Sequence, residues 1–130
     1  MKKSIPLAMT VKMWPLRKII PYPGNPRNHP PEQITLLATL LKKHGPDQPI
    51  VVDEAGVILK GHGRLTASLE AGLADFPVIQ RFGLPDIEKR AMRISDNAIA
   101  LLSGWAPDLM RVELNGLALA GYDMPLLPPK

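Results

Sequence analysis

The stretch from Val57 to Ala67 limits the fold of this chain more than any other. It joins a short apolar run, residues 57–59, to a helical pattern through two glycines that bracket a histidine and precede an arginine, Gly61-His62-Gly63-Arg64. Glycine lets a backbone turn sharply and approach a ligand closely, and the first turn of a helix presents unpaired N–H groups and the positive end of the helix dipole. The sequence therefore predicts a strand-to-helix corner that binds an anion.

Strand-like and helix-like patterns alternate on both sides of this corner. Short β-branched or alternating runs predict strands at 10–15, 48–53, 57–59 and 75–82. Periodic apolar positions predict helices at 30–44, 65–73, 85–101 and 106–121. Between the first strand and the first helix, the prolines and glycine of 21–29 predict a structured loop that presents Asn25, Arg27, Asn28 and His29.

These elements predict an α/β (α+β) fold with a two-helix extension at the C-terminus. A chain of 130 residues suits one domain. Within it we expect a flexible N-terminus at 1–10, a core at 11–84, a helical extension of the same domain at 85–123 and a tail or linker at 124–130.

The composition narrows the classes of function. The absence of cysteine excludes disulfides, thiolate zinc sites and cysteine nucleophiles. A net charge of +4 favours nucleic acid or phosphate ligands over acidic ones. No window is long and apolar enough to span a bilayer, and the proline-interrupted N-terminus is unlike a signal peptide, so we expect a cytoplasmic protein with no membrane partner.

The order of four motifs resembles that of the ParB/sulfiredoxin superfamily: IPYPGNPR at 20–27, QPIVV at 48–52, GHGRL at 61–65 and ISDN at 94–97. More narrowly, GHGRL, RISDN at 93–97 and Gly104-Trp105 resemble the ParB-like, nuclease-like domain associated with DNA-modification methyltransferases of bacteria and phages. The resemblance implies a ParB/sulfiredoxin-like fold, with a small mixed sheet and crossing helices. It also implies DNA and a nucleotide as ligands, and a bacterial or phage-encoded protein of a methyltransferase, phage or plasmid-partition system.

The resemblance also implies which residues form the site. The phosphate-binding Gly-Glu-Arg-Arg motif of ParB falls on Gly61, His62, Gly63 and Arg64, and two of its four positions match. The glutamate and a later Glu-Asn pair, which help to hold Mg²⁺ on bound CTP in that family, fall on His62 and on Asp96-Asn97. The resemblance further implies that Arg27 faces the same pocket and that Gln48 lies near the base. Because the reactive cysteine of sulfiredoxin falls on His62, that reductase chemistry is excluded.

Each candidate residue also has a purely structural interpretation. Arg64 either binds a phosphate or pins the start of its helix. His62 is a general base, a phosphate donor or a hydrogen-bonded structural residue. Asp96 and Asn97 either bind the ligand or fix their helix by buried hydrogen bonds. The basic residues Lys42, Lys43, Arg90 and Arg93 form either a DNA-facing surface or a solvated face, and clustered carboxylates that would predict a metal site are absent.

Three functional hypotheses follow. The first, which we favour, is a nucleotide- or phosphate-binding module that acts with DNA as an accessory to a methyltransferase domain or a neighbouring protein, with a nucleoside triphosphate and Mg²⁺ as its cofactors. The second is an enzyme, a DNA nuclease with His62 as its catalytic base or a nucleotide hydrolase. The third is a DNA-docking or homodimerisation module without turnover, in which the apolar residues of the last helix pair with a second copy.

Overall fold

The computed structural model describes residues 9–25, 29–102 and 104–127, and of residues 96–102 it describes the backbone alone. The strands are β1 (Val11–Pro15), β2 (Ile50–Val52), β3 (Ile58–Lys60) and β4 (Asp75–Gln80). The helices are α1 (Pro31–His44), α2 (His62–Glu70), α3 (Asp86–Leu102) and α4 (Pro107–Leu119), with short 3-10 helices η1 (Leu16–Lys18) and η2 (Met124–Leu126). No helix among the described residues is long and apolar enough to cross a membrane.

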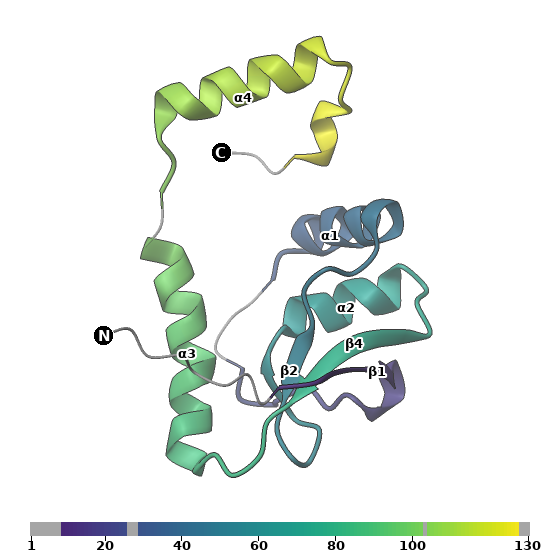
Figure 1. The fold of residues 1–130 in the computed structure, drawn as a ribbon, viewed down its shortest axis with the longest axis vertical. Coiled ribbons are helices and arrows are strands. Elements are labelled where there is room, and N and C mark those ends of the chain that lie inside the picture. The colour runs from purple at the N-terminus through teal and green to yellow at the C-terminus, as the bar shows by residue number, and fades with distance from the viewer. Residues whose placement is uncertain (1–8, 26–28, 103, 128–130) are drawn as a thin grey trace, which may run out of the picture.

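The four strands form one mixed sheet in the order β1-β4-β2-β3. Strand β4 pairs antiparallel with β1 and parallel with β2, and β2 pairs antiparallel with β3. Helices α1 and α2 lie together on one face of this sheet (Figure 1). The predicted α/β class and the small mixed sheet are confirmed.

The core lies between that face of the sheet and the helices α1 and α2. Phe76, Ile50 and Val52 are completely inaccessible to solvent at its centre. Apolar residues that recur at helical spacing, Ile34, Ala38 and Leu41, bring α1 onto them. Burial of these side chains supplies most of the free energy that holds α1, α2 and the sheet together.

Helix α1 begins and ends where its sequence predicts. Pro31 lies in the first turn, where its missing N–H costs nothing, and Glu32 lies near the positive end of the helix dipole. Lys42, Lys43 and His44 fill the last turn, and Gly45 takes a positive φ of 76° directly after it. Pro30 is the N-cap residue, and no side chain caps this end of the helix.

Helix α2 begins three residues earlier than the predicted range 65–73, because only Gly61 makes the turn. Gly61 has a φ of 108°, and the helix starts at the next residue, His62. Gly63 and Arg64 are therefore part of the first helical turn. The glycine corner is tighter than the sequence predicted, and it places both residues directly at the positive end of the helix.

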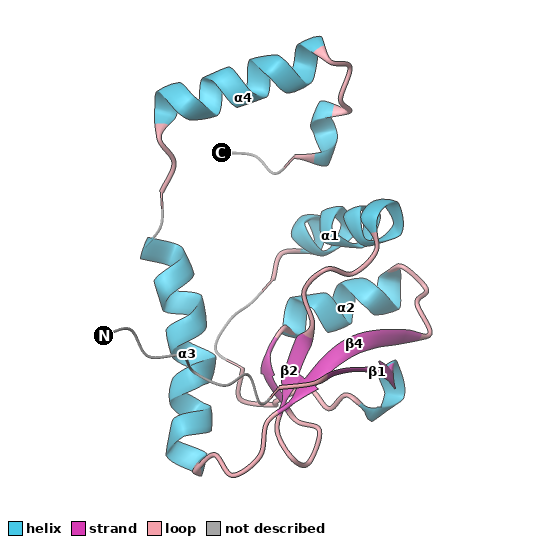
Figure 2. Ribbon diagram, in the orientation of Figure 1, coloured by secondary structure: helices cyan, strands magenta, loops and turns pink. Residues whose placement is uncertain are grey.

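The C-terminal helices lie outside the core. Helix α3 packs beside β3, whereas α4 lies beyond α1 and has no buried residue (Figures 1 and 2). Trp105, which precedes α4, is 72% exposed. Residues 124–126, expected to be part of a tail, instead form η2, which returns to α1, and the ring of Tyr122 lies 4.4 Å from the Lys43 ammonium.

Candidate functional site

The first turn of α2 lies at the wall of a cavity of about 390 Å³. Strand β3, the loop before α1, α1 and α3 form the other walls. The polar lining side chains are Asn25, His29, Gln33, Lys60, His62, Arg64 and Arg93, and the apolar ones are Ile34, Leu36, Leu37, Leu40 and Leu59. None of the described lining residues is an aspartate or a glutamate. The cavity therefore combines basic side chains from β3, α2 and α3 with apolar side chains that come mostly from α1.

Gly61 allows β3 to run directly into α2. Its φ of 108° belongs to the left-handed region, which a side chain makes costly. A Cβ atom at Gly61 would also lie 3.0 Å from Cγ1 of the buried Ile50. As glycine, Gly61 offers no side chain to cap α2, so no side-chain cap competes with a ligand for the N–H groups at this helix end.

Two residues of the predicted site meet at the edge of the cavity. The Arg64 guanidinium donates a hydrogen bond to the side-chain oxygen of Gln48. Gln48 belongs to the QPIVV motif and Arg64 to the GHGRL motif. The connection before β2 brings Gln48 to the first turn of α2. Gln48 thereby orients Arg64, and an arginine held in one direction forms its hydrogen bonds to an anion with a smaller loss of side-chain entropy.

His62 is half-buried, and its ring is bound to the backbone of the proline-rich loop. The Tyr22 N–H donates to Nε2 of His62 at 3.0 Å. This bond requires a free electron pair on Nε2, so in the neutral ring the proton lies on Nδ1. Burial, the charge of Arg93 and the neighbouring His29 lower the pKa of His62. The structure thus holds His62 as a neutral imidazole that accepts a hydrogen bond through Nε2.

Arg93 lies in the cavity wall and not on an open helix face. It is 5% exposed, whereas the sequence predicted an exposed position, on either a DNA-facing surface or a solvated helix face. Its Nε donates to the Ile58 carbonyl at 2.9 Å, and its guanidinium carbon lies 3.7 Å from the centre of the Tyr22 ring. The periodicity of α3 by itself could not predict the burial of Arg93, because β3 and the loop at residues 20–25 cover this side chain.

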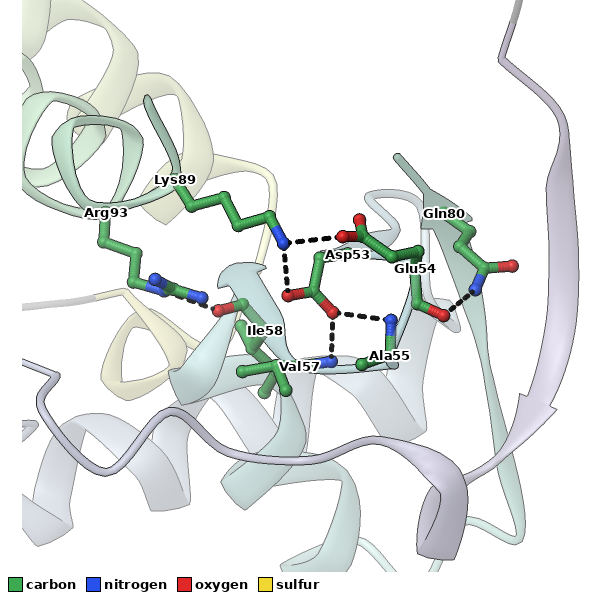
Figure 3. Close-up of polar contacts among 8 residues, drawn as sticks. All are labelled: Asp53, Glu54, Ala55, Val57, Ile58, Gln80, Lys89 and Arg93. Atoms are coloured by element: carbon green, nitrogen blue, oxygen red, sulfur yellow. Dashed lines mark hydrogen bonds and ion pairs between the residues drawn. The ribbon is translucent and has the colours of Figure 1, made fainter. Parts of the chain in front are cut away.

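One turn before Arg93, Lys89 fixes α3 to the turn between β2 and β3 (Figure 3). Its ammonium lies 3.2 Å from Oδ2 of Asp53 and 2.9 Å from Oε1 of Glu54. The other oxygen of Asp53 accepts the N–H groups of Ala55 and Val57, both at 2.9 Å. Asp53 therefore shapes the hairpin turn and also binds α3, which in turn positions Arg93.

The protonation states of this cluster follow from those contacts. Burial acts to raise the pKa of Asp53, but the hydrogen bonds from Val57, Lys89 and Ala55 outweigh it, and the pKa lies below its ordinary value. The hydrogen bond with Lys89 lowers the pKa of Glu54, and the same bond raises the pKa of Lys89. All three groups are therefore charged around neutral pH.

The other basic residues of the predicted DNA surface are exposed. Lys42 and Lys43 lie in the last turn of α1, and Arg90 lies on α3. Lys43 is also the residue that contacts the Tyr122 ring. These side chains come from two helices and do not line the cavity.

Three residues that the resemblance placed in the site cannot be located in it. Arg27 lies outside the described residues, and Asp96 and Asn97 lie on α3 in the part whose side chains are not described. No group of three or more His, Asp or Glu side chains that could hold a metal ion occurs among the described residues. Mg²⁺ prefers oxygen ligands, above all carboxylates, so the described lining residues do not fit this ion.

His29, Gln33, Lys60 and Tyr22 were not predicted to be site residues, although His29 was expected in the loop before α1. His29 and Gln33 line the cavity, and Nδ1 of His29 lies 3.0 Å from Oε1 of Gln33. The signal that could have pointed to His29 is Gly63, where the ParB motif has an arginine: a missing side chain leaves space for a neighbour. Tyr22 acts through its backbone N–H and its ring, which a motif match does not reveal.

The fold and the cavity define a class of protein: α/β domains in which a glycine joins a strand of a mixed sheet to a helix whose first turn borders a basic cavity. Residues 4–98 match the family model of the ParB N-terminal domain. The chain belongs to this family, and the predicted relationship to the ParB/sulfiredoxin superfamily is confirmed.

A curated relative is the ParB-like nuclease domain-containing protein YnaK of Escherichia coli (strain K12). It is 38% identical over 76 residues, which are 58% of this chain and 87% of the relative. The described fold also resembles that of sulfiredoxin from Arabidopsis thaliana, with a TM-score of 0.54 at 20% identity over 65% of this chain and 99% of that one.

Two structures of the C-terminally truncated chromosome-partitioning protein ParB from Caulobacter crescentus are also similar. The one complexed with CTP-gamma-S is 27% identical with a TM-score of 0.62, over 68% of this chain and 52% of that chain. The one complexed to the centromeric parS site is 28% identical with a TM-score of 0.56, over 66% of this chain and 46% of that chain. This chain thus spans about half the length of the ParB chains that it matches.

Proposed function

We propose that this chain binds the phosphate groups of a nucleotide in the cavity at the first turn of α2 and acts with DNA. One observation carries the proposal: Lys60, His62, Arg64 and Arg93 line a single cavity, and no carboxylate occurs among its described lining residues. The cationic side chains among them, Lys60, Arg64 and Arg93, attract an anion that enters the cavity. Arg64, held by Gln48, is the principal phosphate ligand in this proposal.

The size of the cavity and its combination of basic and apolar lining residues support a nucleotide over a simple ion. Its volume of about 390 Å³ falls within the usual range of small-molecule sites. The apolar side chains of α1, among them Leu36, Leu37 and Leu40, offer a surface for a flat base, while α2 offers cations for the phosphates. The Caulobacter relative, whose structure contains CTP-gamma-S, makes CTP the first nucleotide to test.

Calorimetric titration with CTP, ATP and GTP, each with and without Mg²⁺, tests the proposal. We expect Arg64→Ala to weaken binding of the preferred nucleotide about tenfold or more, because a charged hydrogen bond to phosphate is lost. Arg17→Ala is the matched control, since Arg17 is exposed on η1 and lies outside the cavity lining. Absence of binding by all three nucleotides, or equal affinities of wild type and Arg64→Ala, contradicts the proposal.

Mg²⁺ takes no part in the proposed binding, because the described lining residues offer this ion no carboxylate. Protein cations neutralise the phosphates in its place. We therefore expect the titrations with and without Mg²⁺ to give similar affinities, apart from the effect of Mg²⁺ on the free nucleotide. An affinity that depends on Mg²⁺ and is lost in Asp96→Asn would instead assign the ion to the C-terminal part of α3.

The DNA part of the proposal rests on the net charge of +4, on the exposed Lys42, Lys43 and Arg90, and on the relative solved with the parS site. DNA binding through such side chains weakens steeply with salt. We expect Lys42→Gln with Lys43→Gln to weaken binding of a DNA duplex and to lower its salt dependence, as measured by fluorescence anisotropy. Binding that is equally strong in the double variant excludes α1 as the DNA-facing element.

We further propose that the chain is an accessory of a DNA-modification methyltransferase, a phage or a plasmid system, as the ISDN and Gly104-Trp105 motifs suggest. The exposed apolar residues of α4, Leu109 and Val112, support a protein partner or a second copy of the chain. Sedimentation of the chain alone, and then with the product of a neighbouring methyltransferase gene, distinguishes these partners. A monomer that binds no methyltransferase contradicts this part of the proposal.

A nuclease is the second candidate, because the relative YnaK is named for a nuclease domain. Against it stands the hydrogen bond from the Tyr22 N–H to Nε2 of His62, which occupies the electron pair that a general base needs. We expect neither single- nor double-stranded DNA to be cleaved. Cleavage by the wild type that is lost in His62→Gln would establish the nuclease.

A further inference from the structure

The two ring nitrogens of His62 have different hydrogen-bond roles. Nε2 accepts the Tyr22 N–H at 3.0 Å, so the proton of the neutral ring lies on Nδ1. Within the described part of the chain, this Nδ1–H group donates to no acceptor. No side-chain nitrogen or oxygen of the described residues is both buried and without a partner, so Nδ1 is accessible. His62 therefore carries one accessible N–H donor, which points away from the Tyr22 backbone.

The position of His62 places this donor at the proposed ligand site. His62 is the first residue of α2, and its side chain lines the cavity. Arg64 follows in the same helical turn and lines the same cavity, held by Gln48. The bond from the Tyr22 N–H fixes the ring, because turning the ring over would remove the acceptor of that N–H group. A donor that is fixed before the ligand arrives loses little entropy on binding.

A neutral ring in this tautomer can bind an acceptor but not a metal ion. A metal ligand needs a free electron pair, whereas Nδ1 carries the proton and the electron pair of Nε2 points at the Tyr22 N–H. Burial, Arg93 and His29 lower the pKa of His62, which favours this neutral form. The described lining residues include no carboxylate that would accept the Nδ1–H group. In a complex, the acceptor then comes from the ligand.

We propose that the Nδ1–H group of His62 donates a hydrogen bond to a phosphate oxygen of the ligand that Arg64 binds. This inference rests on the proposed binding of phosphate groups in the cavity. It gives His62 two separate functions: Nε2 holds the proline-rich loop, and Nδ1–H holds the ligand. It also makes the contact one with a neutral donor, so His62 binds the phosphate without a metal ion between them.

Nitrogen NMR of the histidine rings tests the tautomer without any ligand. We expect long-range proton–nitrogen correlation spectra at about pH 8, where imidazole is neutral, to show a protonated Nδ1 and an unprotonated Nε2 in His62. Free histidine in water prefers the proton on Nε2, so this tautomer is distinctive. The signals of His62 are assigned by their absence in His62→Gln. A His62 ring with its proton on Nε2 overturns the proposal.

Two substitutions separate the functions of the two nitrogens. In His62→Gln the amide reaches the position of Nε2, so an oxygen still accepts the Tyr22 N–H, but the Nδ1–H donor is lost. In His62→Asn the shorter side chain keeps an N–H donor at the position of Nδ1 and loses the acceptor. We expect His62→Gln to bind inorganic tripolyphosphate and CTP about tenfold more weakly, with a nearly unchanged free energy of unfolding. His62→Asn shows the reverse, with tighter binding than His62→Gln and a lower free energy of unfolding.

Calorimetry at about pH 8 measures the affinities, and urea denaturation at the same pH measures the free energies of unfolding. His44→Gln, which alters an exposed histidine at the end of α1, is the control and keeps both values. A residue with a purely structural role would lose affinity only in step with stability, so His62→Asn would then bind more weakly than His62→Gln. That order of affinities contradicts the proposal.

The outcomes separate this inference from the proposed function. If the wild type binds tripolyphosphate or CTP and Arg64→Ala does not, but His62→Gln binds as tightly as the wild type, phosphate groups bind without His62 and this inference is wrong. If the wild type binds neither tripolyphosphate nor CTP, the proposed function fails, and this inference fails with it.

Discussion

Gly61 and Gly63 stand two residues apart, and each is glycine for a different physical reason. Gly61 turns the chain, because its φ of 108° lies in the left-handed region. Gly63 has an ordinary helical backbone and makes room for the ring of His29. The same residue type in one motif therefore supports the local turn in one case and a contact between distant segments in the other.

We expect Gly61→Ala to lower the free energy of unfolding by about 2 to 3 kcal/mol, as measured by urea denaturation. Left-handed backbone costs alanine about 1 to 2 kcal/mol, and the new Cβ would also lie 3.0 Å from Cγ1 of Ile50. Gly72→Ala separates the two effects, because Gly72 also has a positive φ, 75°, but open space around it. Equal losses in both variants would mean that the contact with Ile50 is harmless.

His62 makes the stability of the fold depend on pH. Its folded-state pKa is lowered, first by burial and then by Arg93 and His29, so the folded protein favours the neutral ring. The resulting stabilisation is complete above the ordinary histidine pKa, about 6.5, and is lost as the pH falls through the lower folded-state value. Protonation also removes the acceptor for the Tyr22 N–H.

We therefore expect the free energy of unfolding to decrease from pH 7.5 to pH 5, and to decrease less in His62→Gln. Glutamine offers an acceptor oxygen but does not titrate. His44→Gln, at an exposed position, should follow the wild-type curve. Urea denaturation across this pH range makes the measurement, and parallel curves for His62→Gln and wild type would contradict the prediction.

At the scale of elements, α3 is held to the sheet by two basic residues one turn apart. Lys89 binds Asp53 and Glu54 of the β2–β3 turn, and Arg93 binds the Ile58 carbonyl of β3. Asp53 is the centre of this contact, because it also accepts two backbone N–H groups of the turn. The position of Arg93 in the cavity thus depends on a carboxylate that itself lies outside the cavity.

We expect Asp53→Ala to lower the free energy of unfolding by about 2 kcal/mol, because it leaves two N–H groups without their acceptor and removes one of the two carboxylates that bind Lys89. Asp53→Asn should cost less, since an amide oxygen can still accept from the turn. Asp108→Ala is the control: Asp108 forms an exposed ion pair with Arg111, and its loss should change stability by less than about 0.5 kcal/mol.

Asp53 also makes the free energy of unfolding depend on pH in the acidic range. The folded-state pKa of Asp53 is lowered, so its stabilisation is present above the ordinary aspartate pKa, about 3.9, and is lost as the pH falls through the folded-state value. The difference in stability between wild type and Asp53→Asn should therefore shrink below about pH 4. A constant difference down to pH 2 would show that the charge of Asp53 contributes nothing.

At the scale of the whole molecule, the chain consists of a packed core and an outer α4. Phe76 is completely buried, whereas Leu109 and Val112 on α4 are 69% and 66% exposed. Local stability follows buried apolar contacts, so amide exchange should be slow in the central strands and fast in α4. The unpartnered apolar side chains of α4 remain available to another protein or a second copy.

We expect Phe76→Ala to cost about 3 to 5 kcal/mol, and Leu109→Ser or Val112→Ser less than about 0.5 kcal/mol. The reason is that the first substitution leaves a cavity in the core, while the other two alter side chains that already contact solvent. Urea denaturation at low protein concentration makes the comparison. A large loss in Leu109→Ser would mean that α4 is packed against a partner in solution.

Local chemistry by itself determined the kinds of elements and the glycine corner. Periodic apolar residues, proline at the first turn and glycine after the last turn predicted α1 correctly, because these signals act within a few residues of one another. The small mixed sheet was expected from the resemblance, although the order of its strands was not. Arg64 was expected just before α2 and lies in its first turn. The start of α2 was misplaced, because Gly63 was read as part of the turn.

The tertiary structure alone decided which side chains share the cavity. The Tyr22 N–H reaches His62 across 40 residues, and Arg93 reaches Ile58 across 35. His29 likewise meets Gly63 only after α1 has packed on α2. No local pattern encodes such contacts, because they depend on how whole elements bury their apolar faces against each other. The sequence therefore predicted the glycine corner, whereas packing alone placed the ring of His29 against it.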